Sequence, residues 1–117
     1  MSRHEQSARL RHMLKHAREA VAISEGRTRA DLDEDRLFNL ALVRLLEIIG
    51  EAASRVPVEE QKNYPNIPWS EIVGLRNRLI HGYDVVDFDV VWQIITRDLP
   101  PLVTTLEAAI RPIQDSW

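Results

Sequence analysis

The sequence predicts an all-α fold, an up-and-down helical bundle of four to five helices that is homodimeric. Apolar side chains recur at helical spacing along most of the chain, and there is almost no strand signal. The 117 residues are 44% hydrophobic and 28% charged, which is typical of a globular protein and argues against disorder. We therefore expect residues 1–117 to form a single helical domain, small enough for oligomerisation to help its stability.

The first expected helix opens the chain. Ser2 and Glu5 have the spacing of a capping box, and the helix should run to about Glu25, with Gly26 as its stop. Its apolar residues at core spacing are Leu10, Leu14, Ala17 and Val21.

The second expected helix begins at Asp31 and continues to about Val56, before Pro57. Its apolar residues cover most of its circumference and leave a narrow polar stripe. The stripe consists of Arg36, Arg44, Glu47, Glu51 and Arg55. A helix so widely apolar is either central in its bundle or shared with a second subunit. Because a small bundle cannot easily surround one helix, we expect a dimer interface here.

Residues 57–68 hold three of the six prolines and should form a connector with one helical turn. Pro68 suits the first position of the third helix, which should end at Gly82, directly after His81.

Asp87 is a good cap for a fourth helix. The Leu-Pro-Pro sequence at residues 99–101 should break or kink the chain, because proline lacks a donor and disfavours helix in the preceding residue. A last helix should follow over residues 101–110 and end at Arg111 and Pro112.

The composition excludes several classes of protein. The chain has no Cys, which excludes disulfides, thiolate metal sites and cysteine nucleophiles and fits a reducing compartment. No stretch approaches the roughly 20 apolar residues that a membrane span requires. We expect a soluble, cytoplasmic protein that does not enter a membrane.

Charge is unevenly distributed along the chain. Residues 1–29 carry seven Arg or Lys against three Glu, a net charge of +4, whereas the remaining residues carry −7 and the whole chain −3. A basic first helix beside Arg76 and Arg78 could form a local track for a polyanion. A solvated helix face is the more ordinary explanation of the same charges.

The most informative segment is residues 75–83, which contains Arg76, Asn77, Arg78, His81 and Tyr83. The fork of an arginine matches phosphate oxygens, and a histidine can carry a proton near neutral pH. Such a set is suited to binding and cleaving a phosphodiester. Each residue also has a plain structural role: the histidine as a helix cap, Arg76 or Arg78 as an ion-pair partner of Glu71 or Asp84, and the tyrosine as a cover for the bundle end.

Helical geometry constrains how this segment can work. On one continuous helix, Arg76 and His81 would lie about 140° apart around the axis and about 7.5 Å apart along it. They would not share a face, so Arg76 of one subunit should meet His81 of another more easily. A His81 in the last helical turn would also be favoured in its protonated form.

Four segments in order resemble one known family. The sequence Arg76-Asn77-x-x-x-His81-x-Tyr83 is similar to the signature of the HepT-like branch of the HEPN superfamily. Residues 46–53, 65–69 and 85–102 resemble further segments of that branch, and the resemblance spans about residues 5 to 110.

The resemblance implies a homodimeric ribonuclease toxin of a toxin–antitoxin pair, with the motif in a cleft between subunits. Cleavage of RNA, with tRNA and mRNA as candidate substrates, would need no metal or other cofactor. His81 would be the general acid or base and Arg76 would stabilise the transition state, while Asn77 and Arg78 support them. A minimal nucleotidyltransferase antitoxin would transfer AMP to Tyr83.

Three alternatives stay open. The protein could be a non-catalytic dimer that binds a nucleotide or RNA and regulates or scaffolds its nucleotidyltransferase partner. His12 and His16 have the spacing of helical zinc ligands but lack a clear third ligand, so a solvated or RNA-facing pair is favoured. Glu47 and Glu51 could form a carboxylate pair, although ion pairing with the arginines of their stripe is the better interpretation.

Overall fold

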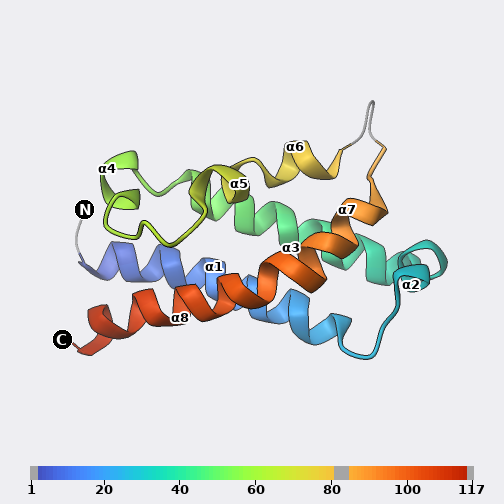
Figure 1. Ribbon diagram of the computed structural model, residues 1–117, viewed down its shortest axis with the longest axis horizontal. Coiled ribbons are helices and arrows are strands. Elements are labelled where there is room, and N and C mark those ends of the chain that lie inside the picture. Colours follow the sequence, from blue (N-terminus) through green and yellow to red (C-terminus); the bar gives the residue numbers. More distant parts are fainter. Residues whose placement is uncertain (1–2, 81–84, 116–117) are drawn as a thin grey trace.

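Three long helices form the body of the protein in an up-and-down arrangement: α1 (Arg3–Ser24), α3 (Arg36–Ser54) and α8 (Leu99–Asp115) (Figure 1). The computed structural model describes residues 3–80 and 85–115, and the side chains of residues 8–80 and 85–111. The remaining described elements are short helices: α2 (Arg29–Glu34), α4 (Val58–Gln61), α5 (Trp69–Val73), α6 (Leu75–Leu79), α7 (Phe88–Gln93) and the π-helical η1 (Ile94–Asp98). The all-α prediction is confirmed.

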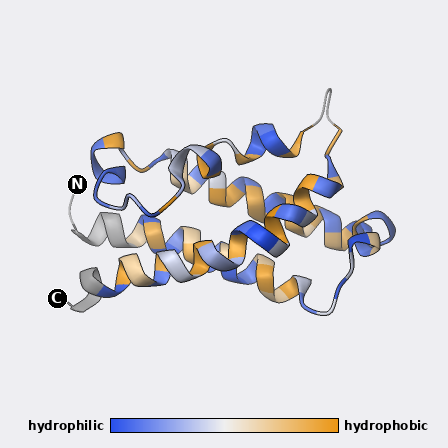
Figure 2. Ribbon diagram, in the orientation of Figure 1, coloured by the Kyte–Doolittle hydropathy of each residue, from blue (hydrophilic) through white to orange (hydrophobic). Residues whose placement is uncertain are grey.

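The core lies where α1 packs against both α3 and α8. Apolar and polar positions alternate around these helices, as Figure 2 shows. The predicted core residues Leu10, Leu14 and Ala17 are buried, and Val21 is half-buried. Met13 and Ala20 are fully buried as well and complete the inner face of α1. None of the helices in the described ranges is long and apolar enough to cross a membrane.

The end of α1 follows the prediction. Its last residue is Ser24, and Gly26 adopts a φ of 73°, a left-handed conformation that glycine reaches without steric cost. The proposed cap at Ser2 lies outside the described residues.

The second expected helix is two helices, so the prediction of one continuous helix from Asp31 is wrong. Asp35 between them has an extended backbone, with φ −112° and ψ 101°, and its carboxylate accepts a hydrogen bond of 3.1 Å from the Phe38 amide. Arg27 donates to the same carboxylate at 2.7 Å. Asp35 therefore acts as the N-cap of α3 and stops α2.

A buried amide fixes the angle between α2 and α3. Asn39 is 5% exposed, and its Nδ2 donates to the Leu32 carbonyl at 2.9 Å. The bond satisfies a carbonyl at the end of α2 that has no further helical turn to bond to.

The third expected helix is divided and ends early. Connector 57–68 contains the expected turn, α4, and Pro68 directly precedes α5. Gly74 separates α5 from α6, and α6 ends at Leu79 rather than at Gly82. Ile80 is extended and pairs with Val86 in an antiparallel bridge.

Backbone bonding explains this early end. The Asp87 amide donates to the Leu79 carbonyl at 2.8 Å, so that carbonyl bonds to the residue that follows Val86 and not along a helix. His81 and Gly82 lie outside the described residues, and the prediction of a helix that contains His81 is not supported by α6.

The last part of the chain is more continuous than expected. Asp87 caps α7 as predicted, accepting from the Asp89 and Val90 amides at 3.0 and 3.2 Å. No break occurs at residues 99–101, because the backbone stays helical through η1, where the Leu99 amide donates to the Ile94 carbonyl.

The π turn lets the helix pass the two prolines. It widens the backbone just before the first turn of α8, where a missing proline donor is tolerated. Helix α8 also continues to Asp115, beyond its expected end at residue 110.

Candidate active site

Gly50 sets how closely the motif-bearing segment approaches α3. A Cβ atom at this position would lie 3.0 Å from the Ile72 carbonyl oxygen and 3.5 Å from the Leu75 Cβ. A glycine inside a helix costs about 1 kcal/mol relative to alanine. Its presence here allows α5 and α6 to lie directly against α3.

Helix α6 is amphipathic over its five residues. Leu75 and Leu79 are buried at 3% and 1% exposure, whereas Arg76, Asn77 and Arg78 are exposed. The two leucines thus hold the helix against the core, and the polar residues of the motif face outward.

Arg76 and Asn77 line a depression between α6 and the polar stripe of α3. The depression is about 280 Å³ in volume, and its other lining residues are Arg44, Glu47, Gly50, Glu51, Ser54 and Val73. Within residues 8–80 and 85–111, the Arg76 guanidinium makes no hydrogen bond or ion pair, so the alternative pairing with Glu71 is not observed. The Arg76 donors therefore remain available to a ligand in this part of the structure.

Arg78 occupies a different environment. Its Nη2 donates to Asp98 Oδ2 at 3.1 Å, and it borders a small apolar depression between α5 and the start of α8. The structure brings Arg76 and Asn77 together and does not bring Arg78 to them. Arg78 thus pairs with Asp98 and not with Glu71, one of the two carboxylates considered as alternative partners of the arginines.

His81 and Tyr83 lie outside the described residues, and so does Asp84. What the structure describes is the pairing on either side of them, between Ile80 and Val86 and between Leu79 and Asp87. The estimated separation of Arg76 and His81 on one helix does not apply, because α6 ends at Leu79.

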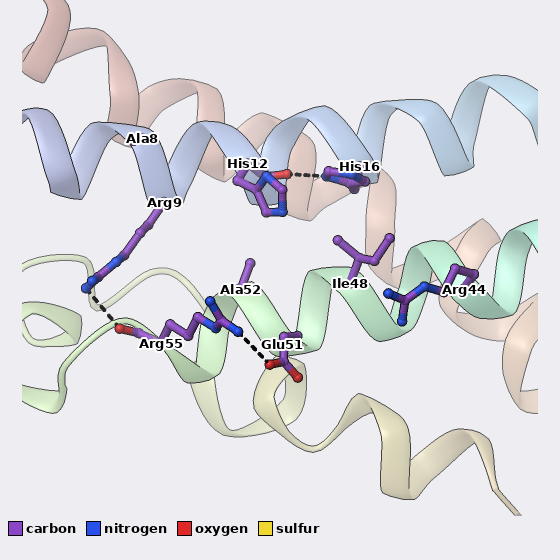
Figure 3. A pocket seen from close by; sticks show the side chains of 9 residues that line it. All are labelled: Ala8, Arg9, His12, His16, Arg44, Ile48, Glu51, Ala52 and Arg55. Carbon is purple, nitrogen blue, oxygen red and sulfur yellow. Dashed lines mark hydrogen bonds and ion pairs between the residues drawn. The ribbon is translucent and has the colours of Figure 1, made fainter.

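A second and larger depression lies between α1 and α3, with a volume of about 760 Å³. We call it the α1–α3 groove; its lining residues are Ala8, Arg9, His12, His16, Arg44, Ile48, Glu51, Ala52 and Arg55. Figure 3 shows His12 on α1 and Ile48 and Ala52 on α3 directed into the space between the two helices. The basic charge of residues 1–29 predicted a polyanion track beside Arg76 and Arg78, but not a groove between α1 and α3.

The two histidines of the groove are in contact. His16 Nδ1 lies 2.7 Å from the His12 carbonyl oxygen, and the ring centroids are 4.4 Å apart. Partial burial lowers the pKa of His12, and the neighbouring His16, Lys15 and Arg55 lower it further. The part of the chain that the structure describes contains no group of three His, Cys, Asp or Glu side chains that could hold a metal ion.

The carboxylates of α3 pair along their own helix, as predicted. Arg55 Nη2 lies 3.1 Å from Glu51 Oε1, and Arg44 Nη1 lies 4.0 Å from Glu47 Oε1. The interpretation of Glu47 and Glu51 as ion-pair partners is therefore confirmed.

Comparison with known proteins identifies the family. A family model described as ribonuclease HepT-like matches residues 13–109. The chain belongs to the HepT-like ribonuclease family. The resemblance found in the motif segments is thereby confirmed.

Individual relatives agree with this assignment. A Methanocaldococcus jannaschii protein provisionally named an RNase is 33% identical over 92% of this chain and 98% of its own length. A protein of Thermococcus cleftensis, named with a similar qualification as ribonuclease HepT, is 40% identical over 72% of this chain and 80% of its own. A Caldanaerobacter subterraneus protein provisionally named an RNase is 36% identical over 80% of this chain and 83% of its own. No solved structure matched this HepT-like chain.

Proposed function

We propose that this HepT-like protein is a metal-independent ribonuclease toxin of a toxin–antitoxin pair, acting in the cytoplasm on RNA. The observation that carries the proposal is Arg76, an exposed guanidinium without a bonding partner among the described side chains, in the motif of a ribonuclease family. An arginine kept for structure alone would be expected to pair with a carboxylate, as Arg78 does with Asp98.

The proposed reaction is attack of a ribose 2′-oxygen on the adjacent phosphorus. His81 accepts the 2′-hydroxyl proton, and a proton is returned to the departing 5′-oxygen. The products are a 2′,3′-cyclic phosphate and a 5′-hydroxyl end. Arg76 donates to the non-bridging oxygens, on which negative charge develops in the transition state. Asn77, its neighbour at the same depression, orients the phosphate or His81.

We further propose that two subunits form the site. Leu37 and Leu40 are 80% and 48% exposed on α3, the helix that the sequence singled out as unusually apolar. A symmetric dimer through this helix would cover both side chains in each subunit. The family resemblance implies that the motif of such a dimer lies in the cleft between the subunits.

Tyr83 is the proposed point of control. Transfer of AMP from a nucleotidyltransferase antitoxin to its hydroxyl would place a bulky anion two residues from His81. The added phosphate would repel a substrate phosphodiester and occupy its space. Mass spectrometry of the protein co-expressed with its antitoxin should find an AMP-sized addition on Tyr83, and its complete absence would remove this step.

Incubation of the purified protein with total RNA in EDTA tests the proposed activity. Wild type should cleave the RNA and His81→Ala should not, while both show the same thermal unfolding. If neither protein cleaves, the protein is instead the non-catalytic binding dimer. If His81→Ala cleaves as well as wild type, the assigned mechanism is wrong.

A further inference from the structure

The α1–α3 groove is built by two antiparallel helices. Arg9 Nη1 donates to the Arg55 carbonyl at 2.9 Å at one end, and His16 and Arg44 lie toward the other (Figure 3). From Arg44 to Arg55 the groove follows α3 for about 16 Å at the helical rise. Successive phosphates of one strand in a duplex are about 3.4 Å apart along its axis. The groove is therefore long enough to contact more than one phosphate.

The groove is basic although the protein is acidic. Among the described side chains, three arginines line it against one carboxylate, that of Glu51, whereas the chain as a whole carries a net charge of −3. The two lining histidines add positive charge when protonated. A local excess of cations on an acidic protein attracts a polyanion to that place and not to the surface in general.

The groove is contiguous with the depression at Arg76. Arg44 and Glu51 line both the groove and this depression, since they lie on the part of α3 between α1 and α6. An RNA strand that lies along the groove can pass over Arg44 and Glu51 and reach Arg76 and Asn77.

We propose that the α1–α3 groove binds the phosphodiester backbone of a single-stranded RNA, the part of the substrate next to the phosphate at Arg76. This inference rests on the proposed ribonuclease function. Among the described side chains, the two imidazoles are the only rings that line the groove, so most of the contact is to the backbone and tolerates any base sequence.

The histidines make this binding pH-dependent. The charged groups around them are Arg9, Lys15, Arg44, Glu51 and Arg55. Partial burial, then His16, Lys15 and Arg55, lowers the pKa of His12, so this groove residue gains its charge only as the pH falls. RNA should therefore bind more tightly at pH 5.5 than at pH 7.5, and His12→Gln should reduce that difference.

The test uses the full chain carrying His81→Ala, so that RNA is bound without cleavage. Fluorescence anisotropy with a labelled 20-nucleotide oligouridine measures Kd at several salt concentrations. Arg44→Ala/Arg55→Ala in this background removes two groove cations. The matched control, Arg11→Ala/Arg111→Ala, removes two arginines that line the separate depression between α1 and α8.

The groove variant should bind about tenfold more weakly or worse, and the slope of log K against log salt should fall by about 1.4, for two lost phosphate contacts. The control should change Kd by less than about twofold. An equal loss in both variants, or no loss in the groove variant, would overturn the inference. Cleavage by the wild-type protein is scored separately: if it cleaves RNA while the groove variant binds normally, the groove assignment alone fails. If it does not cleave but the groove variant binds weakly, the ribonuclease proposal alone fails.

Discussion

Replacing Gly50 by alanine tests how the packing of α3 positions the active site. The new Cβ would lie 3.0 Å from the Ile72 carbonyl oxygen, closer than carbon and oxygen normally approach, so α5 and α6 must move outward by a few tenths of an ångström. Alanine gains about 1 kcal/mol in helix propensity, and overpacking costs about 1–3 kcal/mol. The net change in the free energy of unfolding should be a loss of about 0–2 kcal/mol.

The effect on RNA cleavage should exceed the effect on stability. Arg76 follows Leu75, whose Cβ the new methyl group would also contact at 3.5 Å, and small displacements of a catalytic group lower rates steeply. We expect a loss of about tenfold in kcat/KM for cleavage of a labelled RNA. The free energy of unfolding is measured separately by urea titration.

Ala41→Gly is the matched control. Ala41 is exposed on the same helix, so this change should cost about 1 kcal/mol through helix propensity alone and leave kcat/KM unchanged. The reasoning is refuted if Gly50→Ala is about 1 kcal/mol more stable than wild type and fully active, because the close approach to Ile72 would then impose no constraint.

Three further predictions concern residues outside this contact. Asn39→Ala removes the buried donor to the Leu32 carbonyl and should lower the free energy of unfolding by about 1–3 kcal/mol in urea; a change below about 0.5 kcal/mol would show that this bond does not hold α2 to α3. The hydrogen bond from Arg27, and after it the bond from the Phe38 amide, lowers the folded-state pKa of Asp35. The ionised carboxylate therefore stabilises the folded protein above the unfolded pKa, and this stabilisation is lost as the pH falls below about 4. Thermal melts from pH 6 to pH 3 should therefore show a smaller drop for Asp35→Asn than for wild type, and equal drops would contradict this. Arg78→Ala breaks an exposed ion pair with Asp98 and should cost less than about 1 kcal/mol and less than about threefold in cleavage rate, so a loss as large as that of Arg76→Ala would place Arg78 in the reaction.

Local signals in the sequence predicted much of the fold. Helical periodicity identified α1 and α3, Gly26 marked the end of α1, and Asp87 marked the start of α7, because each of these acts through its nearest neighbours. The predicted helix ends were wrong where residues distant in the sequence determine them. Asp35 stops α2 with the help of Arg27, eight residues away, and Ile80 leaves the helix because Val86 pairs with it.

The candidate site also combines features that the sequence predicts with features that depend on packing. The motif itself was visible, but the availability of Arg76 and the engagement of Arg78 by Asp98 depend on how α6 sits against α3 and η1. The α1–α3 groove could not be predicted, because it requires the antiparallel register that brings His16 to Arg44 and Arg9 to Arg55.

The rate of RNA cleavage by Arg76→Ala, measured in EDTA against wild type, tests the central claim most directly. Arg76 has no bonding partner among the described residues, so its removal should leave the unfolding energy within about 0.5 kcal/mol of wild type. Losing one donor to the developing charge should slow cleavage by about 10²- to 10³-fold, or about 3–4 kcal/mol in the barrier. Wild-type products should carry 2′,3′-cyclic phosphate and 5′-hydroxyl ends. Equal rates for the two proteins, or wild-type cleavage that EDTA abolishes, would contradict a metal-independent ribonuclease centred on Arg76.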